Sequence, residues 1–274
     1  MTVALKGSLL LAGAGKMGGA LLAGWLGRGL DPQRVLVQDP GPPSEVRELL
    51  AKHGMLAHAA VTALAEPPAV IVVAVKPQVL DDVLPPLARL VGPDTLLLSI
   101  AAGRTLRSLE AHLPAGTAVV RSMPNTPAAI GLGITVCCAN AHFTADQRAL
   151  CDALLSAVGE VAWVVDEGLI DAATAVSGSG PAYVFLLAEC LADAGKAAGL
   201  EEGLARRLAN ATVSGAGALL RGSGVEPAEL RRNVTSPHGT TAAALSILMG
   251  EAGLQPLLTR AVLAAAERSR ELSA

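Results

Sequence analysis

The sequence contains few aromatic residues and few charges. Aromatic side chains make up 2% of the 274 residues and charged side chains 16%, whereas hydrophobic residues make up 51%. Cores must therefore be built from alanine, valine, leucine and glycine, and helices with such small side chains can approach closely. Apolar residues in this excess need cover beyond the core of one chain, which indicates oligomerisation.

Basic charge is scarce as well. The formal net charge is −3 at pH 7, and stretches such as ARRLAN and ELRRNV contain too few basic residues to form a stripe. Proteins that bind polyanions usually present such a stripe. We therefore expect no nucleic-acid partner.

Cysteine pairs and zinc-type clusters are also lacking. The four cysteines form no CxxC motif, and no Cys/His cluster has the spacing of a zinc site. The pattern favours reduced, partly buried thiols in a cytoplasmic protein without a bound metal. The residues concerned are Cys137, Cys138, Cys151 and Cys190.

No run of residues suits a membrane span. The longest uncharged stretch, 122–145, is broken by prolines and glycines, so it cannot cross as a helix. The N-terminal KGSLLLAGAG begins as a signal peptide would, but Lys16 interrupts its apolar run almost at once. We expect no membrane or secretory segment, and a cytoplasmic location.

What is present is a change of periodicity along the chain. Up to about residue 165, short β-branched runs bounded by Gly, Pro or Asp alternate with amphipathic segments, which favours a parallel sheet covered on both faces. Beyond residue 166 the period is 3.6 residues, with no convincing strand. We therefore expect an α/β half followed by an all-α half. The predicted strands are 8–13, 34–39, 69–75, 94–103, 117–123, 133–139 and 160–165.

A glycine-rich turn follows the first predicted strand. Residues 13–18, GAGKMG, match G-x-G-x-x-G ahead of a helix that we expect to begin near Met17. Gly13 permits the tight turn, Gly15 lets the backbone approach a pyrophosphate, and Gly18 lets helix and sheet touch. The helix N-terminus offers N–H groups to phosphates. The turn predicts a dinucleotide cofactor, the alternative being a structural turn.

An acidic residue ends the second predicted strand. Asp39 lies 21 residues beyond Gly18, near the spacing expected of a ribose-binding carboxylate. A carboxylate there favours a free 2′-hydroxyl, hence NAD, and repels a 2′-phosphate. Arg34 and Arg47 could meet that phosphate instead, and a loop or helix-capping role for Asp39 is the alternative.

Two later strand ends carry candidate binding residues. The segment AVKPQ, 74–78, puts Lys76 and Pro77 just past a buried strand, and SIAAG, 99–103, leaves the next strand with small residues. In an open parallel sheet, ligands bind at the carboxyl ends of strands. We expect the cofactor to lie against this backbone, whereas Lys76 is alternatively a surface lysine.

Hydroxyl-rich clusters open two predicted helices in the second half. Pro181 in SGSGPAYVF (177–185) suits a first helical turn, and Thr240 or Thr241 in VTSPHGTTAAAL (234–245) is expected to cap an alanine-rich helix. Unpaired N–H groups and hydroxyls at a positive helix end can receive a small carboxylate. We predict a site for an anionic small molecule, the alternative being two ordinary capped helices.

Six segments in order along the chain closely resemble those of pyrroline-5-carboxylate reductases, and the similarity runs over essentially the whole length. They are GAGKMG, AVKPQ, SIAAG, RSMPNTPAAIGLG (121–133), AVSGSGPAYVF (175–185) and NVTSPHGTTAAAL (233–245), of which the last three are long and specific. The resemblance implies a Rossmann-type doubly wound sheet followed by an all-α C-terminal dimerisation domain. The change of periodicity places the boundary near Asp166–Asp171, so we assign residues 1–166 to the first domain and residues 167–274 to the second. It also implies a homodimer that assembles further, often to a decamer.

The resemblance further implies the reduction of 1-pyrroline-5-carboxylate to L-proline by NAD(P)H, the last step of proline biosynthesis. A cyclic imine is easily protonated, so the enzyme must supply orientation more than a strong acid. Thr241 would be catalytic, its hydroxyl facing the imine nitrogen. The substrate would bind at Ser179, Pro181, Ser236, Gly239, Thr240 and Thr241. The cofactor would contact Gly13, Ala14, Gly15, Lys16, Met17, Gly18, Asp39, Ala74, Val75, Lys76, Pro77, Ala101, Ala102 and Asn125.

Three positions depart from the family pattern. His238 stands where the family usually has glycine, so either the site is tighter or the imidazole turns outward. Lys16 replaces a commoner uncharged polar residue and could add a phosphate contact. Asp39 leaves NAD as an alternative to the usual NADP.

Two other functions are alternatives. A hydroxyacid dehydrogenase would place a catalytic lysine early on the first interdomain helix, but Lys196 lies 15 residues beyond Pro181, about four turns along. A non-catalytic NADPH-binding regulator is the second alternative. A hydrolase nucleophile elbow is disfavoured because Ser177 occupies a glycine position of G-x-S-x-G, and the five histidines form no triad or metal set.

Overall fold

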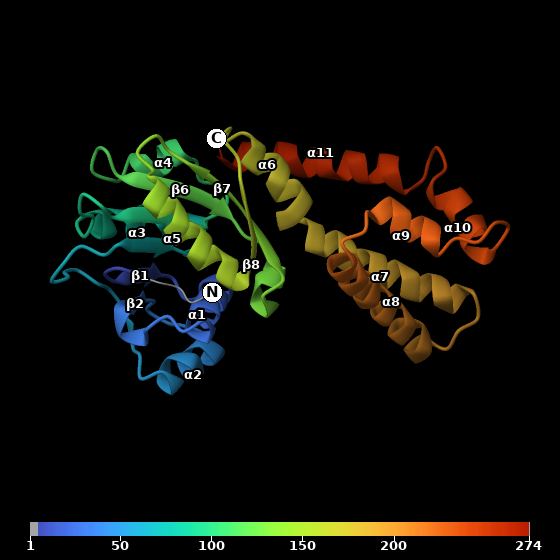
Figure 1. Ribbon diagram of the computed structural model, residues 1–274, viewed down its shortest axis with the longest axis horizontal. Coiled ribbons are helices and arrows are strands. Elements are labelled where there is room, and N and C mark those ends of the chain that lie inside the picture. Colours follow the sequence, from blue (N-terminus) through green and yellow to red (C-terminus); the bar gives the residue numbers. More distant parts are fainter. Residues whose placement is uncertain (1–4, 274) are drawn as a thin grey trace. The chain divides into compact units, whose positions relative to one another are not determined.

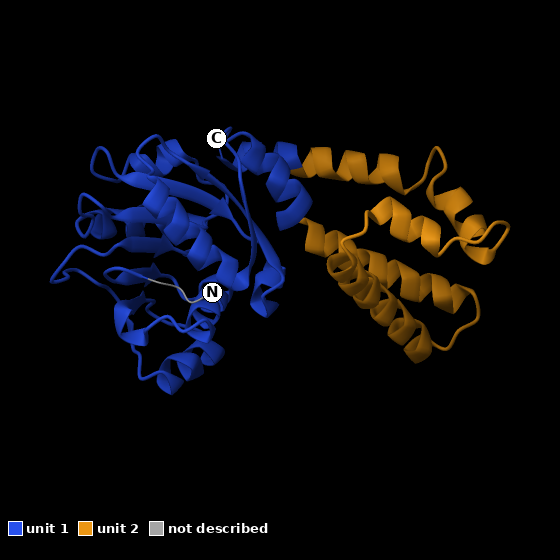
Figure 2. Cartoon of the chain, in the orientation of Figure 1, with its two compact units in different colours: residues 1–178, 266–274 blue, residues 179–265 orange. Residues whose placement is uncertain are grey.

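The chain forms two compact units in a computed structural model that describes residues 5–273 (Figures 1 and 2). Unit 1 is Met1–Gly178 together with Ala266–Ala274, and unit 2 is Ser179–Ala265. The predicted boundary after residue 166 lies just beyond the last strand, which ends at Trp163. Unit 1 continues past this boundary to Gly178 and so includes the helix Leu169–Ala173. As a functional division that boundary stays a prediction, and its outer limits, residues 1 and 274, lie outside the described residues.

Unit 1 is built on an eight-stranded sheet in the order β3-β2-β1-β4-β5-β6-β7-β8 (Figure 1). The seven predicted strands all form, and those from β1 to β6 pair in parallel. The chain crosses from β1 to β2 on one side and later to β4 on the other, as in a doubly wound sheet. The strands are β1 (Leu9–Ala12), β2 (Val35–Gln38), β3 (Ala57–His58), β4 (Val70–Val73), β5 (Leu96–Ser99), β6 (Ala118–Met123), β7 (Gly133–Ala139) and β8 (Gly159–Trp163).

Helices cover both faces of the sheet because successive strand residues point to opposite sides. Leu9 and Leu11 pack in one core with α1, α2 and α5, whereas Leu10 and Ala12 pack in a second core with α3 and α4. Each leucine buried in this way contributes about 2 kcal/mol. The helices of unit 1 are α1 (Lys16–Gly27), α2 (Ser44–Lys52), α3 (Leu80–Ala88), α4 (Leu106–Glu110), α5 (Ala145–Leu155) and α6 (Leu169–Ala173), with 3-10 turns at Pro32–Arg34, Pro77–Val79, Thr126–Ile130 and Ser156–Val158.

Two features of the sheet differ from the expected parallel arrangement. Strand β7 runs antiparallel to β6 because their connection, residues 124–132, contains only the 3-10 turn Thr126–Ile130, which ends at Gly131 (φ +71°), and is too short for a crossover. Strand β8 returns parallel to β7 after α5. The two-residue β3 was not predicted because it lacks an apolar run.

Unit 2 is helical throughout its described residues, as predicted for the second half. Its helices are α7 (Gly180–Ala197), α8 (Glu202–Ser223), α9 (Pro227–Asn233), α10 (Thr240–Leu248) and α11 (Leu254–Ser273), whose final turns belong to unit 1. Many large apolar side chains are exposed, including Phe185 at 63% and Ile247 at 77%. Unit 2 therefore presents apolar surface that its own described residues do not cover.

One helical stretch, Leu169–Ala197, is long and apolar enough to cross a membrane by length and composition alone. It consists of α6, a π-helical turn at Thr174–Gly178 and α7. Its first part contains Asp171, which is buried and lies 3.7 Å from a guanidinium nitrogen of Arg121. A buried ion pair inside unit 1 is typical of a packed protein helix, so this stretch is weak evidence for a span.

Candidate functional site

The glycine turn between β1 and α1 combines close packing with one open approach. Gly13 has a φ of +92°, and a Cβ there would lie 2.7 Å from the Ala74 carbonyl carbon. A Cβ on Gly18 would collide with the Gly13 carbonyl oxygen. At Gly15, by contrast, no atom of the described chain lies within 4 Å of such a Cβ. Only Gly15 therefore leaves room for a ligand against the backbone.

The N-terminus of α1 faces this open position. The helix begins at Lys16, one residue before the expected start, and its N-cap is Gly15, which has no side chain to cap it. Its first turn reads KMGG, so no carboxylate competes for the leading amides. Those amides are free to bind an anion, and the exposed Lys16 adds a positive charge. The turn fits the pyrophosphate of a dinucleotide.

Asp39 is already engaged by the backbone around the turn. Its Oδ2 accepts a hydrogen bond from Ala14 N at 2.7 Å, and its Oδ1 accepts one from Gly41 N at 2.8 Å. These bonds fix the turn against the end of β2, which is the loop role left open as an alternative. A ribose contact would use the remaining lone pairs of the carboxylate.

The two arginines considered for a 2′-phosphate lie in different surroundings. The Arg34 guanidinium donates to Leu5 O at 2.9 Å, whereas that of Arg47 donates to Pro42 O at 2.8 Å. A backbone hydrogen bond holds the pKa of Glu45 below its usual value, with smaller contributions from Ser44, Arg47 and Lys16. Arg47 and Lys16 thus both act on Glu45 at the start of α2, whereas Arg34 does not.

Three neighbouring strands end side by side at the edge that carries the turn. In register, Ala12 of β1 pairs with Val73 of β4, which pairs with Ser99 of β5. The turn, Ala74 and Ile100 therefore follow at the same edge, where the strand order reverses. Ligands of doubly wound sheets bind in the crevice at this switch point.

The loops after β4 and β5 are joined by an arginine that the sequence did not single out. Arg104 donates to Pro77 O at 3.0 Å and pairs with Asp81 at 2.7 Å. The hydrogen bond from Arg104 is the main reason that the pKa of Asp81 is lowered. No motif signals this link, because Arg104 and its two partners follow different strands. Lys76 is exposed, and its contact with a cofactor stays a prediction.

The other residues of these loops are small and partly covered. Ala74 and Val75 are half-buried, and Ala101 is buried with its N–H directed to Ser99 Oγ at 3.3 Å. Ala102 is exposed beside it. The loops thus present backbone and methyl groups, and their contact with a cofactor stays a prediction.

Asn125 is held on both sides of its amide. Its Nδ2 donates to Ser177 O at 3.1 Å, and its Oδ1 accepts from Ile134 N at 2.9 Å. The side chain thereby joins the end of β6 to the π-helical turn and to β7. One amide hydrogen is left over, so the predicted cofactor contact is compatible with this arrangement and untested by it.

The loop before α10 leaves several donors free. The expected capping by Thr240 or Thr241 is wrong, because the N-cap is Gly239, where no side chain is available. The hydroxyls of Ser236, Thr240 and Thr241 make no hydrogen bond within residues 5–273. A helix N-terminus and three hydroxyls are therefore available to a carboxylate.

This loop is shaped by backbone conformation. His238 has a φ of +59° and is exposed, and among the described residues it is the only non-glycine with a positive φ. A Cβ on Gly239 would collide with Ser236 Oγ. His238 is thus exposed in this chain, which is compatible with the outward placement, and a side chain at Gly239 would displace the Ser236 hydroxyl.

The second predicted helix start has a different form. Pro181 lies in the first turn of α7 as expected, but Ser179 has helical angles (φ −84°, ψ −25°) and follows the π-helical turn directly. The helical stretch therefore runs on from Leu169. The free helix end expected at Ser179 is wrong, and substrate binding by Ser179 and Pro181 stays a prediction.

Other chemistry-bearing groups are either scattered or buried. No group of three His, Cys, Asp or Glu residues within 5–273 could hold a metal ion. Cys137 and Cys151 are buried free thiols, and desolvation raises the pKa of each. Neither thiol is poised as a nucleophile, because the reactive thiolate form is suppressed.

Comparison with known proteins gives one family-model match in each half of the chain and relatives over almost its whole length. Residues 167–272 match the family model described as pyrroline-5-carboxylate reductase dimerisation, and residues 9–103 match the model described as NADP oxidoreductase, coenzyme F420-dependent. The pyrroline-5-carboxylate reductase of Pseudomonas aeruginosa is 45% identical over 95% of this chain and 95% of that protein. The reductase of Pisum sativum is 39% identical over 95% of this chain and 94% of that protein.

Solved structures agree with the sequence comparison. The pyrroline-5-carboxylate reductase of Coxiella burnetii has a TM-score of 0.90 at 33% identity, covering 98% of this chain and 99% of that one. The Plasmodium falciparum pyrroline carboxylate reductase with NADP bound has a TM-score of 0.81 at 29% identity, covering 97% and 98%. With 45% of residues shared with such a reductase over almost its entire length, the chain belongs to the pyrroline-5-carboxylate reductase family.

Proposed function

We propose how this chain carries out the reaction of its family, the reduction of 1-pyrroline-5-carboxylate to L-proline by hydride transfer from NAD(P)H. This reaction is the last step of proline biosynthesis. The single observation that carries the proposal is the open backbone at Gly15, beneath the uncapped N-terminus of α1. It is the place where this chain can seat the pyrophosphate of the cofactor that its family requires.

The residues of unit 1 hold and orient the cofactor, which supplies the hydride when it is bound. The amides that follow Gly15 bind the pyrophosphate, and Lys16 adds a charge to it. Ala101 and Ala102 have no bulk beyond a methyl group, so the nicotinamide can lie against their backbone. Orientation of two small reactants is the main contribution that such a site must make.

The loop before α10 binds the substrate. Its carboxylate is held by the hydroxyls of Ser236 and Thr240 and by the Thr240 amide, beside the bare backbone of Gly239 at the positive end of the helix. The Thr241 hydroxyl donates a hydrogen bond to the neutral imine nitrogen and passes its proton to that nitrogen as the imine carbon receives hydride, and water then returns a proton to the hydroxyl. No strong acid is needed because the amine nitrogen that forms is basic.

Removal of the Thr241 hydroxyl tests this role. We expect Thr241→Val, which keeps the shape, and Thr241→Ala to lower kcat on the order of 100-fold, the usual effect of losing one positioned donor. The KM for NADPH should stay within about twofold, since the phosphates bind elsewhere. Steady-state kinetics with both substrates measures this.

Thr241→Ser is the matched control, because it retains the hydroxyl and should keep most of the turnover. Equal losses of turnover and of cofactor affinity in Thr241→Val would contradict the assignment. A chain that binds NADPH but never oxidises it with the cyclic imine would instead be the non-catalytic regulator considered above.

NADP(H) is the cofactor of this proposal, with NAD(H) as the alternative that Asp39 keeps open. The reductase from Plasmodium falciparum was solved with NADP bound, and residues 9–103 match an NADP oxidoreductase model. Lys16 and Arg47 supply positive charge on the side of the turn where a 2′-phosphate would lie.

The assembly follows from the apolar surface of unit 2. Residues 167–272 match a dimerisation region, and this range includes the apolar stretch Leu169–Ala197. A second copy of the chain, and not lipid, covers those side chains, and the homodimers assemble to a decamer. The protein acts in the cytoplasm on a small molecule, without a nucleic-acid or membrane partner.

A further inference from the structure

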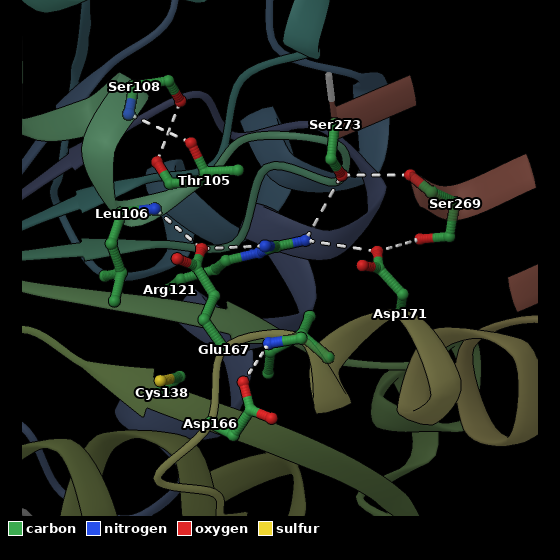
Figure 3. Close-up of polar contacts among 12 residues, drawn as sticks. Thr105, Leu106, Ser108, Arg121, Cys138, Asp166, Glu167, Asp171, Ser269 and Ser273 are labelled. Atoms are coloured by element: carbon green, nitrogen blue, oxygen red, sulfur yellow. Dashed lines mark hydrogen bonds and ion pairs between the residues drawn. The ribbon is translucent and has the colours of Figure 1, made fainter. Parts of the chain in front are cut away.

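An arginine that the proposed mechanism does not use lies buried at the carboxyl end of β6. Arg121 is 4% exposed, and its Nη1 donates to Glu167 Oε1 at 2.8 Å (Figure 3). Its Nη2 lies 3.7 Å from Asp171 Oδ1 and donates to Ser273 Oγ at 3.5 Å. We call Arg121, Glu167 and Asp171 the buried ionic cluster.

The first carboxylate of the cluster leads to the loop that follows β5. Glu167 Oε1, which accepts from Arg121, also accepts from Leu106 N at 2.7 Å. Leu106 is the first residue of α4, whose N-cap is Thr105. One carboxylate oxygen therefore holds both the guanidinium and the end of the loop 100–105.

The second carboxylate leads to the middle of the same loop. Asp171 Oδ1 accepts from Ser269 Oγ at 2.6 Å, which fixes the final turns of α11. Those turns lie against Gly103, where a Cβ would come within 3.1 Å of Leu272 O. Gly103 has a φ of +67°, so the close approach and the turn both require glycine.

The strand of Arg121 supports the beginning of the loop. Arg121 pairs in register with Ser99, and the neighbouring Ser122 Oγ donates to Ser99 O at 2.9 Å. Ser99 Oγ in turn accepts from Ala101 N at 3.3 Å. The loop is thus held at its start, middle and end by elements that converge on one side chain.

The geometry points to Arg121 as a positioning residue, which sets Ala101 and Ala102 against the nicotinamide by tying the loop 100–106 to α6 and α11. This inference rests on the proposed function. Stability alone does not call for such a cluster, since buried ion groups can often be replaced by apolar residues of similar volume without loss. The planar guanidinium of an arginine adds something else: its rigidly arranged N–H donors fix the positions of two carboxylates relative to each other.

The test separates positioning from stability with four variants of the full chain. Arg121→Met removes the guanidinium. Arg121→Lys keeps the positive charge but replaces the guanidinium with a single ammonium group. The triple variant Arg121→Met, Glu167→Leu, Asp171→Leu replaces the whole cluster with apolar side chains. Arg148→Met is the control for the loss of an arginine elsewhere in unit 1. Arg148 is an exposed residue of α5 whose guanidinium lies over the Trp163 ring of β8.

We expect Arg121→Met to lower kcat/KM for NADPH on the order of ten- to hundredfold, as a small misplacement does. The KM for the imine should change by less than about threefold, because the loop before α10, which binds the substrate carboxylate, is unchanged. Arg121→Lys should recover part of the loss. The triple variant should recover the melting temperature and leave kcat/KM low, whereas Arg148→Met should match the wild type.

Limited trypsin digestion supplies a readout that does not depend on activity. Cleavage after Arg104 and Arg107 should be faster in Arg121→Met and in the triple variant, because both release the loop. Recovery of kcat/KM together with stability in the triple variant would overturn the proposal, as would unchanged cleavage at both arginines. A wild-type chain without imine reduction would refute the proposed function while cleavage still tests the loop.

Discussion

Asp39 shows how one side chain can serve two demands. The sequence places a carboxylate where a ribose would bind, and the structure gives both of its oxygens to backbone amides of the turn and of Gly41. The residue therefore shapes the cofactor turn whichever cofactor binds. Its charge, by contrast, bears on the choice between a hydroxyl and a phosphate.

Asp39→Asn separates the hydrogen bonding of this side chain to the turn from the effect of its charge on the choice of cofactor. The amide keeps an oxygen that can accept from Ala14 N, so the turn should hold, while the negative charge is lost. We expect the ratio of kcat/KM for NADPH to that for NADH to rise on the order of tenfold, equivalent to about 1.4 kcal/mol. Paired kinetics with the two cofactors measures it.

Asp31→Asn is a suitable control, since Asp31 is an exposed carboxylate at the start of the 3-10 turn before β2. It should leave the ratio unchanged. An unaltered ratio in Asp39→Asn itself would mean that the charge does not select between the cofactors.

His238 illustrates a residue whose place follows from backbone conformation. The family resemblance puts glycine there, and the left-handed φ of +59° gives the physical reason, because glycine adopts that region without strain. The sequence alone could not reveal this backbone conformation, although it did show that histidine stands where the family usually has glycine.

At the scale of single elements, the glycine turn divides its three glycines between folding and binding. Gly13 and Gly18 are needed for packing of the backbone itself, whereas a Cβ on Gly15 would meet no atom of the described chain within 4 Å. Substitution at these positions should therefore have opposite signatures.

Gly18→Ala should lower the free energy of unfolding, because its methyl group meets the Gly13 carbonyl; we expect about 2 kcal/mol or more. Gly15→Ala should leave thermal unfolding of the cofactor-free protein nearly unchanged and raise the Kd for NADPH at least tenfold. Calorimetry without cofactor and a cofactor fluorescence titration measure the two effects. A Gly15→Ala chain that binds NADPH normally would contradict the placement of the pyrophosphate.

Most elements of unit 1 could be predicted because their signals are local. Seven apolar runs and the glycine turn between β1 and α1 carry enough periodicity and punctuation for that. The antiparallel direction of β7 could not be predicted from the sequence. It depends on the connection between β6 and β7, whose 3-10 turn reverses the chain without a crossover helix. The free end expected at α7 was wrong because the helical stretch continues from α6 through the π-helical turn. The cap expected at α10 was wrong because small hydroxyl residues also suit a loop that leaves its donors free for a ligand.

The buried ionic cluster lay beyond any local pattern. Arg121 stands inside a motif that the resemblance uses, but its partners Glu167 and Asp171 come from a different stretch of the chain, and nothing in the sequence pairs them. Substrate residues were proposed from chemistry and family resemblance, and their assignment awaits the kinetic tests above.

At the scale of the molecule, unit 2 exposes more large apolar side chains than a single chain can leave in water. Phe185 on α7 and Leu257 on α11 are 63% and 53% exposed. Exposed patches of this kind usually mark an interface. Residues 167–272, which include these side chains, match a family model described as a dimerisation region.

Phe185→Glu and Leu257→Glu should each weaken the dimer by roughly 3 kcal/mol or more, since an unpaired carboxylate would be buried at the contact. Light scattering after size-exclusion chromatography should then show monomers at micromolar concentration. Leu56→Glu is the control, because Leu56 is 75% exposed in unit 1 and should leave the mass unchanged. An unaltered mass in both unit 2 variants would remove this surface from the interface.

Unit 1 is assembled from two stretches of chain that are separated by the whole of unit 2. Ala266–Ala274 belong to it, and within this stretch Ser269 and Leu272 reach Asp171 and the backbone near Gly103. During translation, the sheet with its glycine turn emerges first, yet the segment that steadies the loop after β5 emerges only once unit 2 has been synthesised. The loop after β5 can therefore gain these contacts only after the helices of unit 2 have been synthesised, even if the cores of the sheet form earlier.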